Sequence, residues 1–245
     1  GRFHVEDVAR ALVPGTRLLA VSSVDFATGF HCDLEGLGAF CRQKGLLFFV
    51  DAIQGLGAVP MDVRRDHIHF LAAGGHKWLL SAMGCGLLFV HQAVLDRLIP
   101  DRVGWRSVRN ELEFDRLDLE LKPEAARFEV GSANLPGICA LGASIDLLLE
   151  VGVERIRERI LELNDRFHAG LTDRGLRVLT PMGEEERSGI LCFETPEEPQ
   201  ALWRFLDENR VSLSLRRGAL RLAPHAYNNE ADVERFFRVL DRAPR

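Results

Sequence analysis

The chain has 245 residues, of which 47% are hydrophobic and 27% are charged, and its formal net charge at pH 7 is −5. These are ordinary values for a globular protein, and the negative charge argues against a basic surface of the kind that binds nucleic acid or anionic lipid. No apolar run is long enough to cross a bilayer and we find no leader sequence, so we expect a cytoplasmic protein with no membrane partner.

The cysteines indicate neither a disulfide framework nor a metal site. They are five in number and scattered along the chain: Cys32, Cys41, Cys85, Cys139 and Cys192. None of them forms a C-x-x-C pair with another. We therefore expect reduced thiols and no bound metal.

Strand and helix signals alternate in the first half of the chain. Arg17–Val24 is an apolar run of strand length, Asp33 can cap a helix that ends at Gly45, and Leu46–Val50 is typical of a strand buried on both faces. This strand–helix–strand order predicts a mainly parallel sheet between layers of helices, the three-layer α/β class. Two further apolar runs follow: Ile68–Ala73 and Cys85–Val90.

The second half has a different pattern. Helical periodicity runs from Pro136 to about Gly175, and Asn229 can cap a final amphipathic helix. Between them lie three short strand-like pieces: Arg177–Leu179, Gly189–Phe193 and Leu220–Leu222. We interpret residues 1–152 as a large domain and residues 153–245 as a smaller C-terminal α+β domain that begins inside the long helical stretch.

Polar residues follow the predicted strands directly. Ligands of open α/β sheets bind at the carboxyl ends of the strands, and Asp51 comes straight after Leu46–Val50. Gln54 lies three residues further on, and Ile68–Ala73 leads into the sequence GGHKW at 74–78. Lys77 therefore follows a strand end and lies between glycines and a tryptophan. This sequence context differs from that of a solvated surface lysine.

This combination is what a pyridoxal-phosphate site requires. A lysine must lose its proton to attack the cofactor aldehyde, and desolvation lowers its pKa. A carboxylate such as Asp51 keeps the pyridine nitrogen protonated, so that the ring can act as an electron sink. Taken singly, the residues have plainer explanations: Lys77 as a surface lysine, Asp51 as a helix cap, and Gln54 as a loop amide.

The segments VDAIQG at 50–55 and GGHKW at 74–78 resemble the class V aminotransferase superfamily of fold-type I pyridoxal-phosphate enzymes. That group contains cysteine desulfurases, isopenicillin-N epimerase-like proteins and kynureninases. The resemblance continues through three weaker segments: SVDFATG at 23–29, RFEVGSANLPGI at 127–138 and RLAPHAYNNE at 221–230. It implies a fold-type I architecture over nearly the whole chain, with pyridoxal 5'-phosphate as the cofactor.

The resemblance also implies a role for each matching residue. Lys77 would form the Schiff base and carry protons, and Asp51 would pair with the pyridinium nitrogen. Gln54 would bond the ring hydroxyl, and His76 would contact the phosphate. The alternative for His76 is a histidine that hydrogen-bonds to neighbouring groups without contacting the cofactor.

Two further residues match the family at positions far from the strand ends. Ser132, where relatives usually carry threonine, would bind the phosphate in the neighbouring subunit of a homodimer. Arg221 would clamp the α-carboxylate of an amino-acid substrate with its two-pronged guanidinium, although an ordinary ion pair is its plainer explanation. Gly74 departs from the serine that many relatives use to hold the phosphate.

The function expected from this resemblance is that of a class V aminotransferase or an epimerase-like enzyme. A cysteine desulfurase or lyase is disfavoured, because no cysteine stands in residues 208–220 ahead of Arg221, and Cys192 lies in an apolar run. The family's first portion, roughly a third of its usual length, is expected to be missing. A catalytically inactive fragment is therefore a further alternative.

Overall fold

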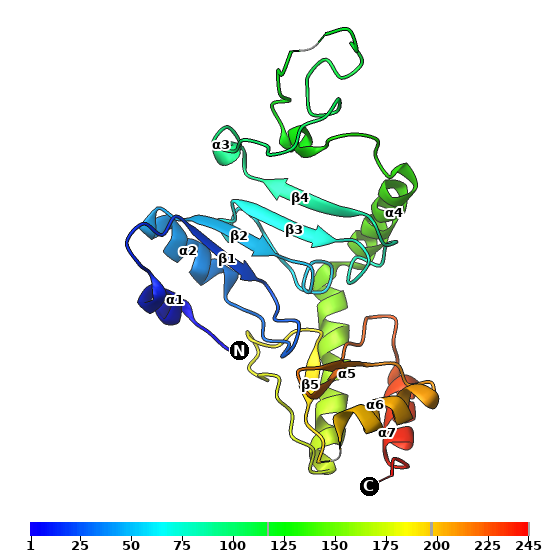
Figure 1. Cartoon of the computed structure of the whole chain (residues 1–245). Coiled ribbons are helices and arrows are strands. Elements are labelled where there is room, and N and C mark those ends of the chain that lie inside the picture. The colour runs from blue at the N-terminus through cyan, green and yellow to red at the C-terminus, as the bar shows by residue number, and fades with distance from the viewer. Residues whose placement is uncertain (117, 197, 245) are drawn as a thin grey trace.

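The computed structural model describes residues 1–116, 118–196 and 198–244. Its first part is built on a four-stranded sheet in the order β1-β2-β3-β4 (Figure 1). The strands are β1 (Leu18–Ser22), β2 (Leu47–Asp51), β3 (Phe70–Gly74) and β4 (Gly86–Val90). The first three are mutually parallel and β4 runs antiparallel to β3, so the mainly parallel α/β class is confirmed.

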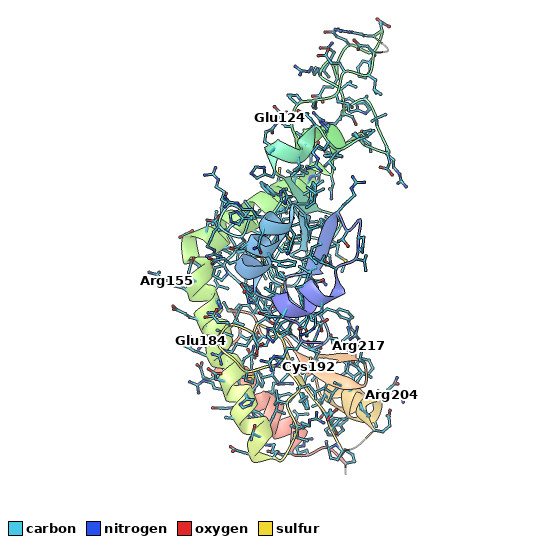
Figure 2. All side chains as sticks on the ribbon, turned by 90° about the vertical axis from the view of Figure 1, so that its left-hand side faces the viewer. Glu124, Arg155, Glu184, Cys192, Arg204 and Arg217 are labelled. Atoms are coloured by element: carbon cyan, nitrogen blue, oxygen red, sulfur yellow. The ribbon has the colours of Figure 1, made fainter. Side chains whose placement is uncertain are left out.

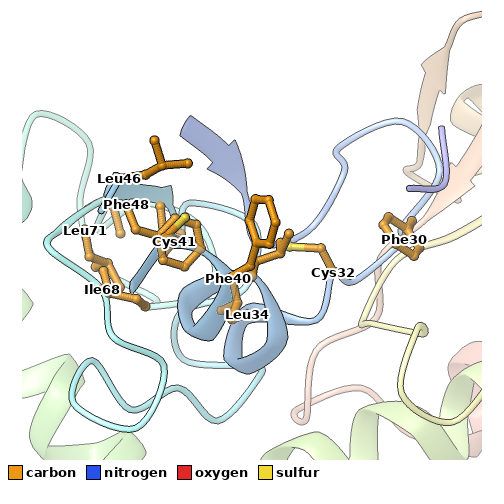
Figure 3. Close-up of a cluster of buried hydrophobic side chains, with 13 residues drawn as sticks. Phe30, Cys32, Leu34, Phe40, Cys41, Leu46, Phe48, Ile68 and Leu71 are labelled. Atoms are coloured by element: carbon orange, nitrogen blue, oxygen red, sulfur yellow. The ribbon is translucent and has the colours of Figure 1, made fainter. Parts of the chain in front are cut away.

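Helix α2 (Leu34–Lys44) covers one face of this sheet, after a short helix α1 (Val5–Ala11). It begins where Asp33 accepts a hydrogen bond from the Gly36 amide at 2.8 Å, and it ends at Gly45, whose φ of 65° suits glycine. Figure 3 shows the core beneath it, where Cys41 and Phe48 are fully buried. These contacts bury the face of the sheet that α2 covers.

The opposite face of the sheet is open within this chain. In β2, Phe48 and Val50 are buried, whereas Phe49 and Asp51 lie half-buried on the other side, so the expectation of a strand buried on both faces was wrong. The open face borders a cavity of about 900 Å³, whose lining includes Asp51, Gly74 and Leu88. No helix in the described residues packs over the middle of this face as α2 does on the other.

The stretch of helical periodicity from Pro136 to about Gly175 forms two helices. They are α4 (Leu135–Val151) and α5 (Val153–Asp173), bent by 79° at Gly152, whose φ is 92°. Within the described residues no single helix is long and apolar enough to cross a membrane; the bent pair reaches that length and composition only when its two members are joined. The domain boundary at 152/153 stays a prediction.

Helix α5 leads to a second, three-stranded antiparallel sheet in the order β5-β7-β6. Its strands are β5 (Leu191–Phe193), β6 (Ser214–Arg216) and β7 (Ala219–Leu222), and its helices are α6 (Pro199–Glu208) and α7 (Glu230–Leu240). Asn229 caps α7 as expected, by accepting from the Ala231 amide at 2.9 Å. The piece Arg177–Leu179 forms only a single bridge, from Val178 to Phe193.

The chain between α3 (Gln92–Leu95) and the 3-10 helix η1 (Ala125–Phe128) extends away from the first sheet, as Figure 2 shows above Glu124. Ile99 and Phe114 in this segment are among the most exposed apolar side chains of the described residues. This segment lies at the opposite end of the molecule from the three-stranded sheet.

Candidate active site

Asp51 is the last residue of β2, so its carboxylate lies at the carboxyl end of a parallel strand. Its side chain is on the open face of the sheet, and its Oδ1 accepts a hydrogen bond from the Ile53 amide at 3.0 Å. This bond fixes the carboxylate at the strand end while leaving Oδ2 available. Asp51 can therefore meet a positively charged or protonated group in the cavity.

Lys77 lies in the loop that follows β3. The loop is held by backbone hydrogen bonds from Gly75 to Cys85 at 2.8 Å and from Ser81 to Gly75 at 2.9 Å. Among the described residues, Lys77 makes no ion pair. Nearby charged residues therefore act on Lys77 by long-range electrostatic interaction, and this interaction changes the pKa of its amine.

The pKa of Lys77 is lowered, chiefly because burial penalises the charged ammonium. The positive charge of Arg221 lowers it further, and Asp51 acts in the opposite direction. The structure thus brings Lys77, Asp51 and Arg221 within electrostatic reach of one another, although Arg221 lies 144 residues beyond Lys77 in the sequence. A neutral amine at Lys77 is a competent nucleophile.

Gln54 and Trp78 form a buried pair beside Lys77. The Trp78 Nε1 donates to the Gln54 Oε1 at 3.3 Å, so the amide oxygen of Gln54 already accepts one hydrogen bond. The Gln54 amide nitrogen is the group that remains to donate to a ring hydroxyl. The predicted role of Gln54 stays a prediction.

The indole of Trp78 stacks on His225, with ring centroids 5.5 Å apart, and His225 stacks on Tyr227 at 5.1 Å. The His225 Nδ1 accepts from the Ala226 amide, so Nε2 carries the ring proton and donates to the Trp78 carbonyl at 3.3 Å. Burial lowers the pKa of His225, which agrees with a neutral ring. Sequence reasoning missed this stack, although its residues lie in the segments quoted for the resemblance.

Arg221 lies on β7, opposite Cys192 of β5 and Ser214 of β6. Its Nη1 donates to the Phe26 carbonyl oxygen at 2.6 Å, and its Nη2 lies 3.4 Å from the Ser214 hydroxyl. The Nε is buried and has no hydrogen-bond partner in the described part of the chain. A guanidinium in this state retains donors for an anion.

The loop at residues 25–29 follows β1. It is held by hydrogen bonds from the three-stranded sheet and from the chain segment that precedes β5. The Thr180 and Ser188 hydroxyls donate to the carbonyls of Thr28 and Gly29 at 2.6 and 2.8 Å. Cys192 donates its thiol proton to the Ala27 carbonyl at 2.6 Å. Burial raises the pKa of that thiol to about 11, so Cys192 stays protonated and has a structural role here.

His76 and Ser132 are the two predicted site residues with the weakest contacts. His76 is exposed, and a Cβ at position 74 would lie 3.0 Å from its ring, so Gly74 makes room for the imidazole. Ser132 is exposed in the segment before α4, and no hydrogen bond joins it to the other candidate residues within 1–116, 118–196 and 198–244. Both phosphate roles stay predictions.

The chain resembles known proteins over most of its length. A sequence profile of the family described as Aminotransferase class-V matches residues 1–236. A probable cysteine desulfurase of Pyrococcus abyssi (strain GE5 / Orsay) is 28% identical, over 98% of this chain and 63% of that protein. Isopenicillin N epimerase of Streptomyces clavuligerus is 32% identical, over 94% of this chain and 61% of that protein. The chain thus spans less than two thirds of either relative.

A solved structure agrees with these matches. A mutant of C-DES, with glycine covalently linked to its PLP cofactor, superimposes with a TM-score of 0.89 at 25% identity, over 98% of this chain and 64% of that chain. Further relatives are named cysteine desulfurases, and one of Bacillus subtilis is named an uncharacterized aminotransferase.

Proposed function

Because the chain belongs to the class-V aminotransferase family, we propose that it carries the catalytic lysine and the substrate-binding arginine of a pyridoxal-phosphate enzyme acting on an amino acid. One observation carries the proposal: the Lys77 amine, with its lowered pKa, is within electrostatic reach of Asp51 and Arg221. The cofactor named for the superimposed C-DES structure supports it.

The donor groups fit this cofactor chemically. An amine, a carboxylate and an amide come from Lys77, Asp51 and Gln54, all at the carboxyl ends of parallel strands. The buried Nε of Arg221, without a partner in the described residues, suits a carboxylate. Gly74 leaves the space next to the His76 ring that a larger residue would fill.

Each residue then has a physical task. Lys77 would hold the cofactor through Nζ and move a proton at that atom, because burial favours its neutral form. Asp51 would keep a proton on the pyridine nitrogen, and Gln54 would donate to the ring hydroxyl. The bound cofactor supplies an electron sink for bonds to the substrate Cα.

The phosphate and the substrate would be held by the remaining residues. His76 would contact the phosphate, and Ser132 would reach the phosphate of a neighbouring subunit in a homodimer. Arg221 would bind the substrate α-carboxylate. The exposed apolar residues of α4, among them Leu147 and Leu149, support a subunit interface in a homodimer, which we expect to be cytoplasmic.

Within this family we propose an aminotransferase or epimerase-like activity. The 32% identity to isopenicillin N epimerase supports it, as does the tight hairpin between β6 and β7, which has no cysteine. The chain spans less than two thirds of the length of these relatives, so the activity, substrate and subunit arrangement are proposed here for the whole protein.

Cysteine desulfurase activity is the second candidate. Several relatives bear that name. Cys85 lines the same cavity as Asp51, so one thiol other than Cys192 lies near the site. Such an activity would need that thiol to take the substrate sulfur.

Reduction with borohydride after incubation with pyridoxal phosphate tests the proposal, in the protein at its natural length. We expect the cofactor to be fixed on the peptide that contains Lys77 and not on that peptide from Lys77→Ala. Release of an oxo acid or inversion at Cα would support the first candidate. Release of L-alanine from L-cysteine, with sulfide freed from the thiol by added dithiothreitol and both products abolished by Cys85→Ser, would support the second, and cofactor fixed elsewhere contradicts both.

A further inference from the structure

The hairpin between β6 and β7 presents a group of arginines on the face that carries Arg221. The register pairs Ser214 with Arg221 and Arg216 with Ala219. Because side chains two residues apart on a strand share a face, Arg216 is on the same face as Ser214 and Arg221. Arg216 is also close enough to lower the pKa of both Lys77 and Arg221.

Arg217 sits at the tip of this hairpin in an unusual conformation. Its φ is 49° and that of Gly218 is 79°, so both central residues of the turn have the positive φ of a type I′ turn. Glycine and asparagine prefer the first of these positions, and an arginine there is uncommon. Such an outlier suggests that arginine occupies position 217 because of what its side chain does, and not because the turn favours arginine.

Phe26 lies between two of these arginines. Its carbonyl accepts from Arg221, and the Arg217 guanidinium carbon lies 5.5 Å from the centroid of its ring. The ring is 44% exposed, so it offers an apolar surface next to the cationic groups. Figure 2 shows Arg217 on the side of the small sheet that faces the rest of the molecule.

Carboxylates are scarce around this group. Arg216, Arg217 and Arg221 take part in no ion pair in the described residues, whereas twelve other arginines do. On the neighbouring loop, Asp25 uses its Oδ1 to accept from the amides of Ala27 and Thr28. The proposed function assigns Asp51 to the cofactor nitrogen and Arg221 to the α-carboxylate, so Arg216 and Arg217 remain unpaired.

We propose that Arg216 and Arg217 form a second anion subsite, and that the substrate is an amino acid whose side chain ends in an acidic group. The inference rests on the proposed function, since Arg221 must take the α-carboxylate. The Phe26 ring would contact the methylene groups of the side chain, and the arginines would bind its terminal acid. The Arg216 Nη1 donates to the Leu215 carbonyl at 2.8 Å, and Arg217 lies over the Phe26 ring, so a neutral amino acid would leave both guanidinium groups without a carboxylate.

Binding of glutarate and butyrate, measured by calorimetry on the protein at its natural length, tests the subsite without cofactor. We expect glutarate to bind more tightly than butyrate. Arg216→Gln and Arg217→Gln should each weaken glutarate binding about tenfold, because each removes a charge-assisted contact, and should leave butyrate binding unchanged. Arg204→Gln is the control, since Arg204 is an exposed arginine of α6 in the same part of the molecule.

Three results would overturn the inference. The first is glutarate binding that is no tighter than butyrate binding, and the second is an Arg204→Gln variant that weakens glutarate binding as much as the other two substitutions do. The third is a loss of pyridoxal-phosphate binding, with unchanged glutarate binding, in Arg216→Gln and Arg217→Gln. This result would mean that the two arginines bind the cofactor phosphate. Fixation of cofactor on Lys77 does not need either arginine, so its failure would count against the proposed function alone.

Discussion

The Nη1 of Arg221 donates a hydrogen bond of 2.6 Å to the carbonyl oxygen of Phe26, across 195 residues of sequence. The bond joins β7 of the small sheet to the loop that follows β1 of the large sheet. It also orients the guanidinium, whose buried Nε has no hydrogen-bond partner among the described residues and whose charge acts on Lys77. The position of the small sheet therefore sets the geometry of the candidate site.

Replacing Asp51 by asparagine should leave cofactor bound but slow turnover. An amide cannot stabilise a proton on the pyridine nitrogen, so the electron sink is lost, and we expect kcat to fall by about 100-fold or more. Steady-state kinetics together with the visible absorption of the lysine-bound cofactor measures both effects. Unchanged turnover in Asp51→Asn would remove Asp51 from the site.

Replacing Arg221 by lysine should raise KM for neutral amino acids about tenfold, because an ammonium cannot make the two-pronged contact with a carboxylate. Arg217→Lys is the control with such substrates, since it is assigned to the side-chain acid and not to the α-carboxylate. KM values for L-alanine in the two variants decide the point. Equal KM values would mean that Arg221 is not the α-carboxylate clamp.

Lys77 should react with amine reagents at lower pH than the exposed Lys44, because burial and Arg221 lower its pKa. Arg216→Gln removes a positive charge and should move the reaction profile to higher pH; Asp51→Asn removes a negative charge and should move it to lower pH. Labelling by reductive methylation, followed by NMR, measures the profile. A Lys77 profile that coincides with that of Lys44 would contradict the prediction.

The same lowered pKa affects stability. Between the folded pKa of Lys77 and its unfolded value of about 10.4, the unfolded chain binds more protons than the folded chain. The burial of Lys77 therefore costs stability at neutral pH, and this cost disappears as pH rises through that window. Lys77→Met should accordingly flatten this part of the stability profile in denaturant titrations.

Replacing Gly189 by alanine should disturb the loop that carries Lys77. A Cβ at this position would overlap the indole of Trp78, and we expect a loss of about 1–3 kcal/mol in the free energy of unfolding. Gly142→Ala is the matched control, because a Cβ there meets no atom within 4 Å and helix α4 would gain about 0.5–1 kcal/mol. Equal unfolding midpoints for the two variants would show that Trp78 is not held as described.

These 245 residues on their own should self-associate and bind pyridoxal phosphate weakly. The face of the sheet that carries Asp51 is open, Leu88 on it is 46% exposed, and β1 and β4 are edge strands in the described residues. Sedimentation velocity and titration with the cofactor test both statements. Tight stoichiometric binding by a monodisperse monomer would show that the open face matters less than its exposure indicates.

The sequence by itself determined the local features of this protein. Alternating strand and helix signals predicted the parallel sheet, and Asp33 and Gly45 marked the ends of α2. The short distance along the chain from a buried strand to Asp51, and from the next strand to Lys77, made both residues candidates, and the resemblance of their two segments to a known family supplied the roles expected of them. Periodicity, capping and strand-end position are set within a few residues, so they can be read without knowing how the chain folds back on itself.

Only the tertiary structure decided which distant groups meet at Lys77. The stack of Trp78 on His225, the bond from Arg221 to Phe26 and the shared face of Arg216 and Arg221 join segments that no local pattern connects. The sequence also could not show that one side of β2 is uncovered. Leu46–Val50 is apolar throughout, and an apolar composition does not indicate what packs against each face of a strand. Such relationships depend on the packing of the two sheets, where burial and long-range contacts, rather than sequence spacing, fix the positions of the charges.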